Sequence, residues 1–459
     1  MGKLFGTNGI RGVVNKEMNI DLASGIGKAW GTYLTRTIQR PKVAIGTDAR
    51  LSNHMLKNAI SAGLLATGCD VVDVGMVPTP TLQYAVKKQG YDSGVIITAS
   101  HNPPNFNGIK GVASDGTEFT KDVENKIEEI YFQQDFKLVE WDKVGSFKTW
   151  DGAIDLYLNG ILESVDVDLI KKQNFHVVLD CGNGAGSVVA PFLLDKLNCR
   201  KTELYCVADG TFPGHNSEPL PENLTDLIKK VPEVDADLGI AQDGDADRAI
   251  FVDEKGEYIW GDKSLALGAK YATEKKGGVT VTPVTTSSCF DDVVQKNNGT
   301  VIHTAVGSPI VARVMIEKNA IFGGEENGGL IFPDVQYCRD SAASIAKILE
   351  IMAKTGKKLS DLIDEIPKYS VLKTKMKCPN DKKELVMKKL AEKVKDSPEV
   401  VKVDETDGVK LYLKNGWVLM RPSGTEPIFR VYTESKEQKN AEEIADKYKS
   451  LAEEIINSN

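Results

Sequence analysis

The chain has 459 residues, of which 41% are hydrophobic and 27% are charged, and its formal net charge is −8 at pH 7. The length predicts three or four domains, and the composition is that of a globular protein. No run approaches the ~20 apolar residues of a membrane span, and the acidic balance argues against nucleic acid as a partner. Seven scattered cysteines, none in a C-x-x-C arrangement, favour reduced thiols and a cytoplasmic location.

The chain opens with a glycine-rich stretch that ends in Phe5-Gly-Thr-Asn-Gly-Ile-Arg-Gly. Glycines let the backbone approach a ligand closely, and Arg11 could grip a phosphate through two hydrogen bonds. An ordinary surface arginine is the alternative. Strands at 43–47 and 71–74 then alternate with helices at 52–67 and 81–88, which predicts an α/β layer with a largely parallel sheet.

Residues 94–110 join a short β-branched strand to a stiff polar loop. Two consecutive prolines exclude a regular helix or central strand, so the loop should hold one shape. Ser100, His101 and Lys110 lie along it. A hydroxyl, an imidazole and an ammonium after a core strand suggest a nucleophile with proton-transfer groups. For the Ser-His pair alone, a polar surface loop is the alternative.

A second α/β unit follows a boundary near residue 150, and it ends in a run of alternating carboxylates, Asp243, Asp245 and Asp247, before Arg248. Carboxylates that cannot disperse repel one another unless a cation neutralises them, so Mg²⁺ is the natural occupant. A calcium EF-hand is excluded, because Arg248 stands where that loop requires glycine and a strand follows instead of a helix. A charged surface turn is the remaining alternative.

A third unit of similar pattern ends in Gly324-Glu-Glu-Asn-Gly-Gly329, where two carboxylates and an amide are suited to binding sugar hydroxyls. An acidic turn without function is the alternative there. From about residue 367 the pattern changes to α+β, and Arg421-Pro-Ser-Gly-Thr-Glu-Pro427 offers a guanidinium, hydroxyls and amides to a dianionic phosphate. We therefore expect domains at 1–150, 151–252, 253–366 and 367–459.

Together, and in this order, these stretches resemble the active-site loops of the α-D-phosphohexomutase family across essentially the whole chain. The resemblance implies three similar α/β domains with mixed, largely parallel sheets and a smaller α+β C-terminal domain around one central cleft. It also implies that a hexose 6-phosphate and a hexose 1-phosphate interconvert through a phosphoserine and a bisphosphorylated sugar, with Mg²⁺ bound and hexose 1,6-bisphosphate as activator.

The resemblance also assigns roles to individual residues. Ser100 would carry the phosphoryl group and, with Asp243, Asp245 and Asp247, hold the metal. His101 and Lys110 are candidates for proton transfer, and Arg11 and Arg248 would support the transferring group. The residues that would bind the substrate's hydroxyls and its second phosphate are Glu325, Asn327, Arg421, Ser423, Gly424, Thr425 and Arg430.

The substrate is a small phosphosugar whose identity stays open at this stage. The amino-terminal and phosphate loops look most like the phosphoglucosamine mutase branch, which favours glucosamine phosphate, and a substrate amine could pair with Glu325 or Glu326. In contrast, Asn327 and Gly329 stand where that branch usually has Ser and His, and Ser308 lacks a histidine that some hexose-specific members have nearby. Glu-Asn-Gly-Gly forms occur among phosphomannomutase/phosphoglucomutase-like members, which are the alternative.

Two other classes of protein could use the same loops. A serine-dependent phosphatase would release inorganic phosphate, and a non-catalytic sugar-phosphate sensor would not need the serine, the lysine or the aspartates, which are all present. The sequence leaves open whether two copies form a homodimer.

Overall fold

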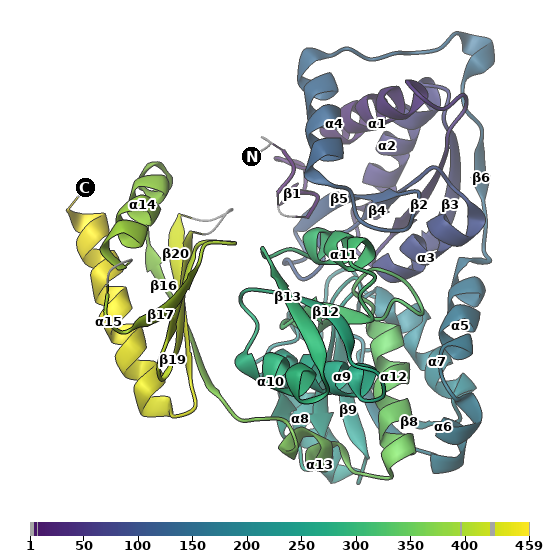
Figure 1. The fold of residues 1–459 in the computed structure, drawn as a ribbon. Helices are drawn as coiled ribbons and strands as arrows, with labels where there is room; N and C mark the ends of the chain where they lie inside the picture. Colours follow the sequence, from purple (N-terminus) through teal and green to yellow (C-terminus); the bar gives the residue numbers. More distant parts are fainter. Residues whose placement is uncertain (1–3, 7, 395–396, 423–426, 459) are drawn as a thin grey trace.

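The computed structural model describes residues 4–6, 8–394, 397–422 and 427–458. In this part of the chain the strands form four sheets that follow one another along the sequence (Figure 1). None of the helices in the described residues is long and apolar enough to cross a membrane.

The first domain is a six-stranded sheet with helices on both faces. Its elements are β1 (Ile10–Val13), α1 (Ile20–Thr35), β2 (Lys42–Thr47), α2 (Asn53–Ala66), β3 (Asp70–Met76), α3 (Thr79–Gln89), β4 (Ser93–Ile97), β5 (Phe106–Ala113), α4 (Lys121–Gln133), the 3₁₀ helix η1 (Trp141–Lys143) and β6 (Phe147–Thr149). Trp30 and Ile60 belong to the apolar cluster on one face, and Leu82 and Val86 to the cluster on the other. The strand order is β1-β5-β4-β2-β3-β6.

The second domain has a five-stranded sheet. Its elements are α5 (Ala153–Glu163), α6 (Val167–Gln173), β7 (His176–Asp180), η2 (Ala185–Val188), α7 (Ala190–Lys196), β8 (Arg200–Leu204), α8 (Thr225–Glu233), β9 (Leu238–Gln242), β10 (Ala249–Asp253) and β11 (Tyr258–Ile259). The strand order is β11-β10-β9-β7-β8. Strands β10 and β11 continue this sheet beyond residue 252, where we expected the boundary, so we propose a boundary after Ile259 instead.

The third domain has four strands. Its elements are α9 (Gly261–Thr273), β12 (Gly278–Pro283), α10 (Ser288–Lys296), β13 (Gly299–Thr304), α11 (Ser308–Glu317), β14 (Phe322–Glu325), β15 (Gly329–Ile331), α12 (Ser341–Thr355) and α13 (Leu359–Asp364). The strand order is β13-β12-β14-β15. Asp340 accepts a hydrogen bond from the amide of Ala343 and so caps α12 at its amino end.

The three sheets share one arrangement, in which β3-β2-β4-β5, β8-β7-β9-β10 and β13-β12-β14-β15 correspond in order and direction. In each, three parallel strands are followed by one antiparallel strand, joined by a hairpin loop. These three hairpin loops hold Ser100, the carboxylates at 243–247 and the turn at 326–328. Each therefore lies at the carboxyl end of a parallel strand, where ligands bind in such sheets.

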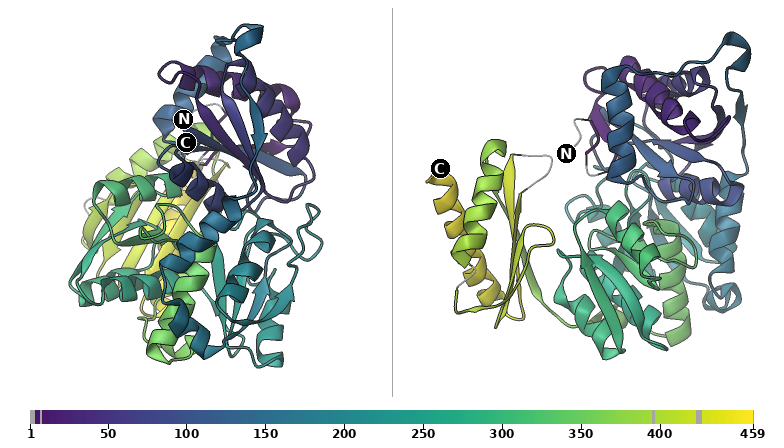
Figure 2. Two further views of the ribbon diagram at one scale, coloured as in Figure 1. Left: turned by 90° about the vertical axis from the view of Figure 1, so that its right-hand side faces the viewer. Right: turned by 45° about the horizontal axis from the view of Figure 1, so that its top comes forward.

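The fourth domain is antiparallel and lies beside the third (Figures 1 and 2). Its elements are β16 (Ser370–Lys377), η3 (Asn380–Lys382), α14 (Lys383–Val394), β17 (Val400–Asp404), β18 (Val409–Leu413), β19 (Gly416–Pro422), β20 (Ile428–Ser435) and α15 (Gln438–Asn457). Val284 of the third domain packs against Trp417 and Leu419, and the Trp417 indole donates to Glu434 at 2.6 Å. The predicted fold class, three α/β domains and a smaller α+β domain, is confirmed.

Candidate active site

Ser100 is buried, with 2% of its surface exposed, at the tip of the β4–β5 hairpin. Its φ of +51° is a conformation that residues with a side chain rarely adopt. The hydroxyl donates to Asp243 Oδ2 at 3.0 Å and lies 3.2 Å from His101 Nδ1. Strain of this kind persists only where the surroundings fix it, and it aims the serine oxygen at the carboxylates of the second domain.

A buried ion pair holds the loop between β4 and β5 together with the first residue of β5, residues 98–106, which are called the serine loop below. Arg50 Nε donates to Asp48 Oδ2 at 3.1 Å, and neither side chain is exposed. The same carboxylate accepts from Thr98, whose hydroxyl in turn accepts from the Ser100 amide at 2.8 Å. The remaining guanidinium hydrogens are donated to four backbone carbonyls of the loop, those of Ser100, Asn102, Pro103 and Phe106.

Sequence reasoning missed this pair. The available signal was its position at the carboxyl end of β2, the strand beside β4, because side chains there lie next to the serine loop.

The loop between β9 and β10, residues 243–248, is called the metal loop below. Its three predicted carboxylates, Asp243, Asp245 and Asp247, lie together, with possible ligand atoms within 4.8 Å of one another. Asp245 Oδ2 accepts from Lys110 and from Thr79, both at 2.6 Å. The other oxygen of Asp245, and Oδ1 of Asp247, are buried without a hydrogen-bond partner. Buried carboxylate oxygens left unpaired are costly unless a cation occupies the space between them, and hard oxygen ligands suit Mg²⁺. These residues therefore fit the metal that the sequence predicts.

Burial raises the pKa of Asp243 to about 7, and the neighbouring carboxylates add to that effect although Arg248 opposes it. Burial acts in the same direction on Asp245, but the Lys110 ammonium outweighs it and holds the pKa of Asp245 below its usual range. The three buried carboxylates also repel one another. A divalent ion bound here would relieve this repulsion.

Four predicted cationic or proton-transfer residues surround the serine. Lys110 is 1% exposed and contacts Asp245, while Arg248 Nε donates to Asp243 Oδ2 at 3.0 Å. Arg11 donates to Asn102 Oδ1 at 2.8 Å. Burial, together with the charges of Arg248 and Arg11, lowers the pKa of His101 to about 2, so its imidazole is neutral.

The predicted sugar loop is tied to the metal loop by Arg339, a second residue that sequence reasoning missed. Its guanidinium donates to Asp247 Oδ2 at 2.5 Å and to Glu325 Oε2 at 2.9 Å. Glu325 is buried, and its other oxygen accepts from the amide of Gly307 at 3.1 Å. Asn327 is exposed beside it. No motif marked Arg339, because it lies outside the loops that the sequence singled out.

The predicted phosphate loop is described only at its edges, because Ser423, Gly424 and Thr425 lie outside the described residues. Arg421 and Arg430 face one another across the register of β19 and β20. Arg421 Nη2 pairs with Asp407 Oδ2 at 2.9 Å, and the same oxygen accepts from the amide of Val306 at 3.0 Å. Asp407 thereby connects the fourth domain to the loop at residues 305–307, whose Gly307 amide donates to Glu325.

A loop of the second domain, residues 205–219, packs against Arg50 and its neighbours in the β2–α2 connection. The Phe212 ring lies 5.0 Å from the Arg50 guanidinium. Within this loop the Nε2 of His215 lies 3.1 Å from both oxygens of Asp180, and its Nδ1 lies 2.7 Å from the carbonyl of Asn216. Burial opposes protonation, but the Asp180 carboxylate outweighs it and raises the pKa of His215 above its usual 6.5.

This raised pKa predicts how His215 contributes to stability. The contribution is complete below pH 6.5 and is lost as the pH rises through the higher pKa of the folded state. We expect the difference in free energy of unfolding between wild type and His215→Gln to be larger at about pH 5.5 than at about pH 8.5. Urea unfolding at the two pH values checks this. A difference that is constant or grows with pH would contradict it.

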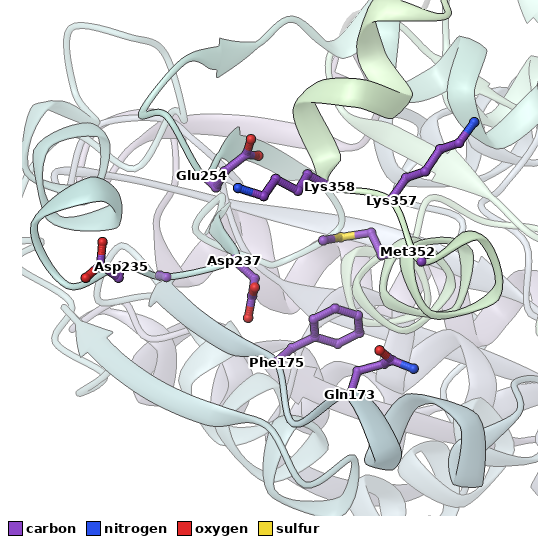
Figure 3. Close-up of a pocket in the computed structure, with 10 residues that line it drawn as sticks. Gln173, Phe175, Asp235, Asp237, Glu254, Met352, Lys357 and Lys358 are labelled. Atoms are coloured by element: carbon purple, nitrogen blue, oxygen red, sulfur yellow. The ribbon is translucent and has the colours of Figure 1, made fainter.

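A separate pocket lies at the amino ends of strands β7 and β9 of the second sheet (Figure 3). Its lining includes Phe175 and Asp237, which directly precede β7 and β9, whereas the metal loop follows β9. Glu254 and Lys358 lie next to each other at its rim, and Asp235 and Lys357 also line it. The pocket contains none of the residues predicted for the chemistry, so the serine and metal loops define the candidate active site.

Comparison with known proteins agrees with this geometry. Four domain families match in succession: "Phosphoglucomutase/phosphomannomutase, alpha/beta/alpha domain I" over residues 2–138, domain II over 155–256, domain III over 260–369 and the C-terminal domain over 374–450. The chain therefore belongs to the phosphoglucomutase/phosphomannomutase family, a family of phosphohexomutases. The recognition made from the sequence motifs is confirmed.

Individual relatives cover almost the whole chain. A phosphoglucomutase/phosphomannomutase of Thermococcus kodakarensis is 47% identical over 99% of this chain and 100% of its own. A phosphoglucosamine/phosphogalactosamine mutase of Sulfurisphaera tokodaii is 41% identical over 99% and 100%. Among solved structures, a phosphoglucomutase/phosphomannomutase family protein of Burkholderia thailandensis superposes with a TM-score of 0.88 at 29% identity, over 98% of this chain and 97% of its own.

Proposed function

We propose that this phosphohexomutase acts through a phosphoserine at Ser100. The observation that carries the proposal is the contact between three hairpin loops: the Ser100 hydroxyl contacts Asp243, and Arg339 joins Asp247 to Glu325. A nucleophile, a metal site and a sugar-binding carboxylate from three domains thus meet at one place.

The proposed reaction exchanges one phosphate ester for another. The bond between phosphorus and Ser100 Oγ breaks as a sugar hydroxyl attacks phosphorus, and the hydroxyl proton passes to a base. The product is a bisphosphorylated sugar, which turns and returns its other phosphoryl group to the serine. His101 and Lys110 are the two candidates for this base: His101 Nδ1 lies 3.2 Å from the Ser100 hydroxyl, and Lys110 Nζ lies 2.6 Å from Asp245 Oδ2.

Charge stabilisation supplies much of the catalysis in phosphoryl transfer. Asp243, Asp245 and Asp247 would hold Mg²⁺, which offsets negative charge on the transferring group when it is bound. Arg248 and Arg11 lie near Ser100. Arg248 is positioned by its contact with Asp243 of the metal loop, and Arg11 by its contact with Asn102 of the serine loop. Arg421 and Arg430 of the fourth domain, with the loop between them, would hold the phosphate that does not react.

Glucosamine phosphate is the substrate that we propose first. The relative from Sulfurisphaera tokodaii and the amino-terminal and phosphate loops support it. Pairing of a substrate amine with Glu325 receives less support, because both oxygens of that carboxylate already accept from Gly307 and Arg339. Glu326 likewise accepts from Thr285 and lies 3.6 Å from the Lys373 ammonium. Mannose and glucose phosphates are the alternative, supported by the relative from Thermococcus kodakarensis.

Phosphorus NMR tests the proposal directly. Purified protein with Mg²⁺ and a trace of hexose 1,6-bisphosphate, the proposed activator, receives glucosamine-, glucose- or mannose-6-phosphate in separate samples. We expect a new hexose 1-phosphate resonance, formed fastest from glucosamine 6-phosphate. Growth of inorganic phosphate alone would indicate a phosphatase, and no change with any sugar would favour a sensor.

Two further parts of the proposal concern the protein's surroundings. All seven cysteines are unpaired in the structure, which supports a reducing, cytoplasmic location. A homodimer stays a proposal that sedimentation analysis can test.

A further inference from the structure

We propose that Arg339 is a positioning residue that fixes the metal loop against the sugar loop, and that Gly329 is a glycine because the Arg339 side chain occupies its space. The inference rests on the proposed metal site and function and adds a residue to them. Arg339 stands between β15 and α12 of the third domain, while Asp247 belongs to the second. One side chain therefore sets the relative position of two catalytic loops.

The first step concerns the two oxygens of Asp247. Oδ2 accepts from Arg339 at 2.5 Å, whereas Oδ1 is buried without a hydrogen-bond partner, and Asp247 is one of the three proposed metal ligands. A partner held on one oxygen fixes the rotation of the carboxylate, and so directs the other oxygen at the ion. Groups that orient metal ligands in this way commonly change metal affinity by about 10–100-fold when they are removed.

The second step concerns the other end of the guanidinium. A second nitrogen of Arg339 donates to Glu325 Oε2 at 2.9 Å, and only 11% of the Arg339 side chain is exposed. A planar guanidinium presents separate nitrogens to two carboxylates that lie apart, whereas the donors of a lysine ammonium all sit on one nitrogen. Arg339 thus connects the proposed metal ligand to the carboxylate proposed to bind sugar hydroxyls.

The third step explains Gly329. A Cβ added at this glycine would lie 2.2 Å from Arg339 Cδ and 2.8 Å from its Cγ. Those atoms cannot move aside freely, because both ion pairs hold the guanidinium beyond them. A side chain at 329 and the present course of Arg339 are therefore mutually exclusive. The two residues form a matched pair.

The test measures metal binding without turnover. Protein is freed of metal with a chelator and titrated with Mn²⁺, a stand-in for Mg²⁺, and free Mn²⁺ is followed by electron paramagnetic resonance. We expect Arg339→Ala to weaken Mn²⁺ binding about 10-fold or more. A role limited to electrostatics predicts the opposite sign, because removal of a cation should tighten Mn²⁺ binding. Arg339→Lys keeps the charge without the bridge and should bind more weakly than wild type.

A double-mutant cycle of Arg339 and Gly329 then tests whether the two residues are coupled. The cycle is read out by kcat and by KM for the sugar phosphate. Gly329→Ser should impair the wild type strongly, yet it should add little to Arg339→Ala, since the space is then free. Arg313→Ala, which breaks an ion pair with Asp115 outside the site, is the control for folding and domain contact. Mn²⁺ affinity in Arg339→Ala equal to or above wild type, or independent effects of the two substitutions, would overturn the inference. Absence of Mn²⁺ binding to the wild type would instead reject the metal site.

Discussion

Ser100→Ala should abolish hexose phosphate interconversion, with a loss of at least about four orders of magnitude in kcat/KM. The reason is chemical, because no other described hydroxyl shares the position of Ser100, with Asp243 on one side and the His101 imidazole on the other. Without that oxygen the phosphoryl group has no acceptor on the protein, and only direct transfer to water or to a second sugar is left. The measurement is a coupled assay of 1-phosphate formation.

The matched control is Ser61→Ala in helix α2 of the same domain. Ser61 is also buried, and its hydroxyl lacks a hydrogen-bond partner, so its removal should change neither folding nor rate. Intact-protein mass spectrometry after incubation with hexose 1,6-bisphosphate adds a second readout. Wild type and Ser61→Ala should gain one phosphoryl group and Ser100→Ala none. A Ser100→Ala protein that still gains the group, or still turns over, would refute the phosphoserine.

Most of the fold was accessible from the sequence because its signals are local. The alternation of β-branched runs with helices predicts the parallel strands, and the helices expected at 52–67 and 81–88 correspond to α2 and α3. A strand was expected at the position of β10, after the metal loop, whereas the antiparallel partners β5 and β15 were harder to foresee. Their pairing is set by hairpin closure across the active-site loops, and β15 is only three residues long.

The boundary that we propose after Ile259 likewise depends on a strand pairing that is not visible in the local sequence. Asp253 to Ile259 turns back to extend the sheet through β11, a two-residue strand whose pairing depends on contacts with β10 rather than on a pattern of its own. A strand that short has no detectable periodicity. Its place in the sheet is therefore a property of the tertiary structure.

Some of the candidate site residues could be predicted from the sequence, and others could not. Ser100, Asp243, Asp245 and Asp247 lie in motifs with strong local signatures, and the structure places them in contact. Arg50 and Arg339 do not, since each acts on a loop that is distant in sequence. A lone arginine has many surface uses, and only the three-dimensional arrangement shows that its partner is a buried carboxylate.

Substitution of Arg50 is therefore the second change from which we expect a large effect. Arg50→Met should lower the free energy of unfolding by about 3–5 kcal/mol, because it leaves the buried Asp48 carboxylate without its counter-charge. It also removes the donors to four loop carbonyls, those of Ser100, Asn102, Pro103 and Phe106. Methionine keeps the aliphatic part of the side chain, so the loss reports mainly the guanidinium: its charge, its hydrogen bonds and its contact with the Phe212 ring.

The effect on catalysis should exceed what partial unfolding explains. Ser100 has a φ of +51°, which the contacts of Arg50 and Thr98 impose on the loop, and a displacement of ~1 Å in such a group typically costs about 100-fold in rate. Urea unfolding gives the stability, and kcat measured well below the unfolding transition gives the rate. Arg40→Met is the matched control, since Arg40 makes the same type of pair with Asp70 on the surface of this domain, where such pairs contribute little. Equal effects of the two substitutions would show that the buried pair does not hold the serine loop.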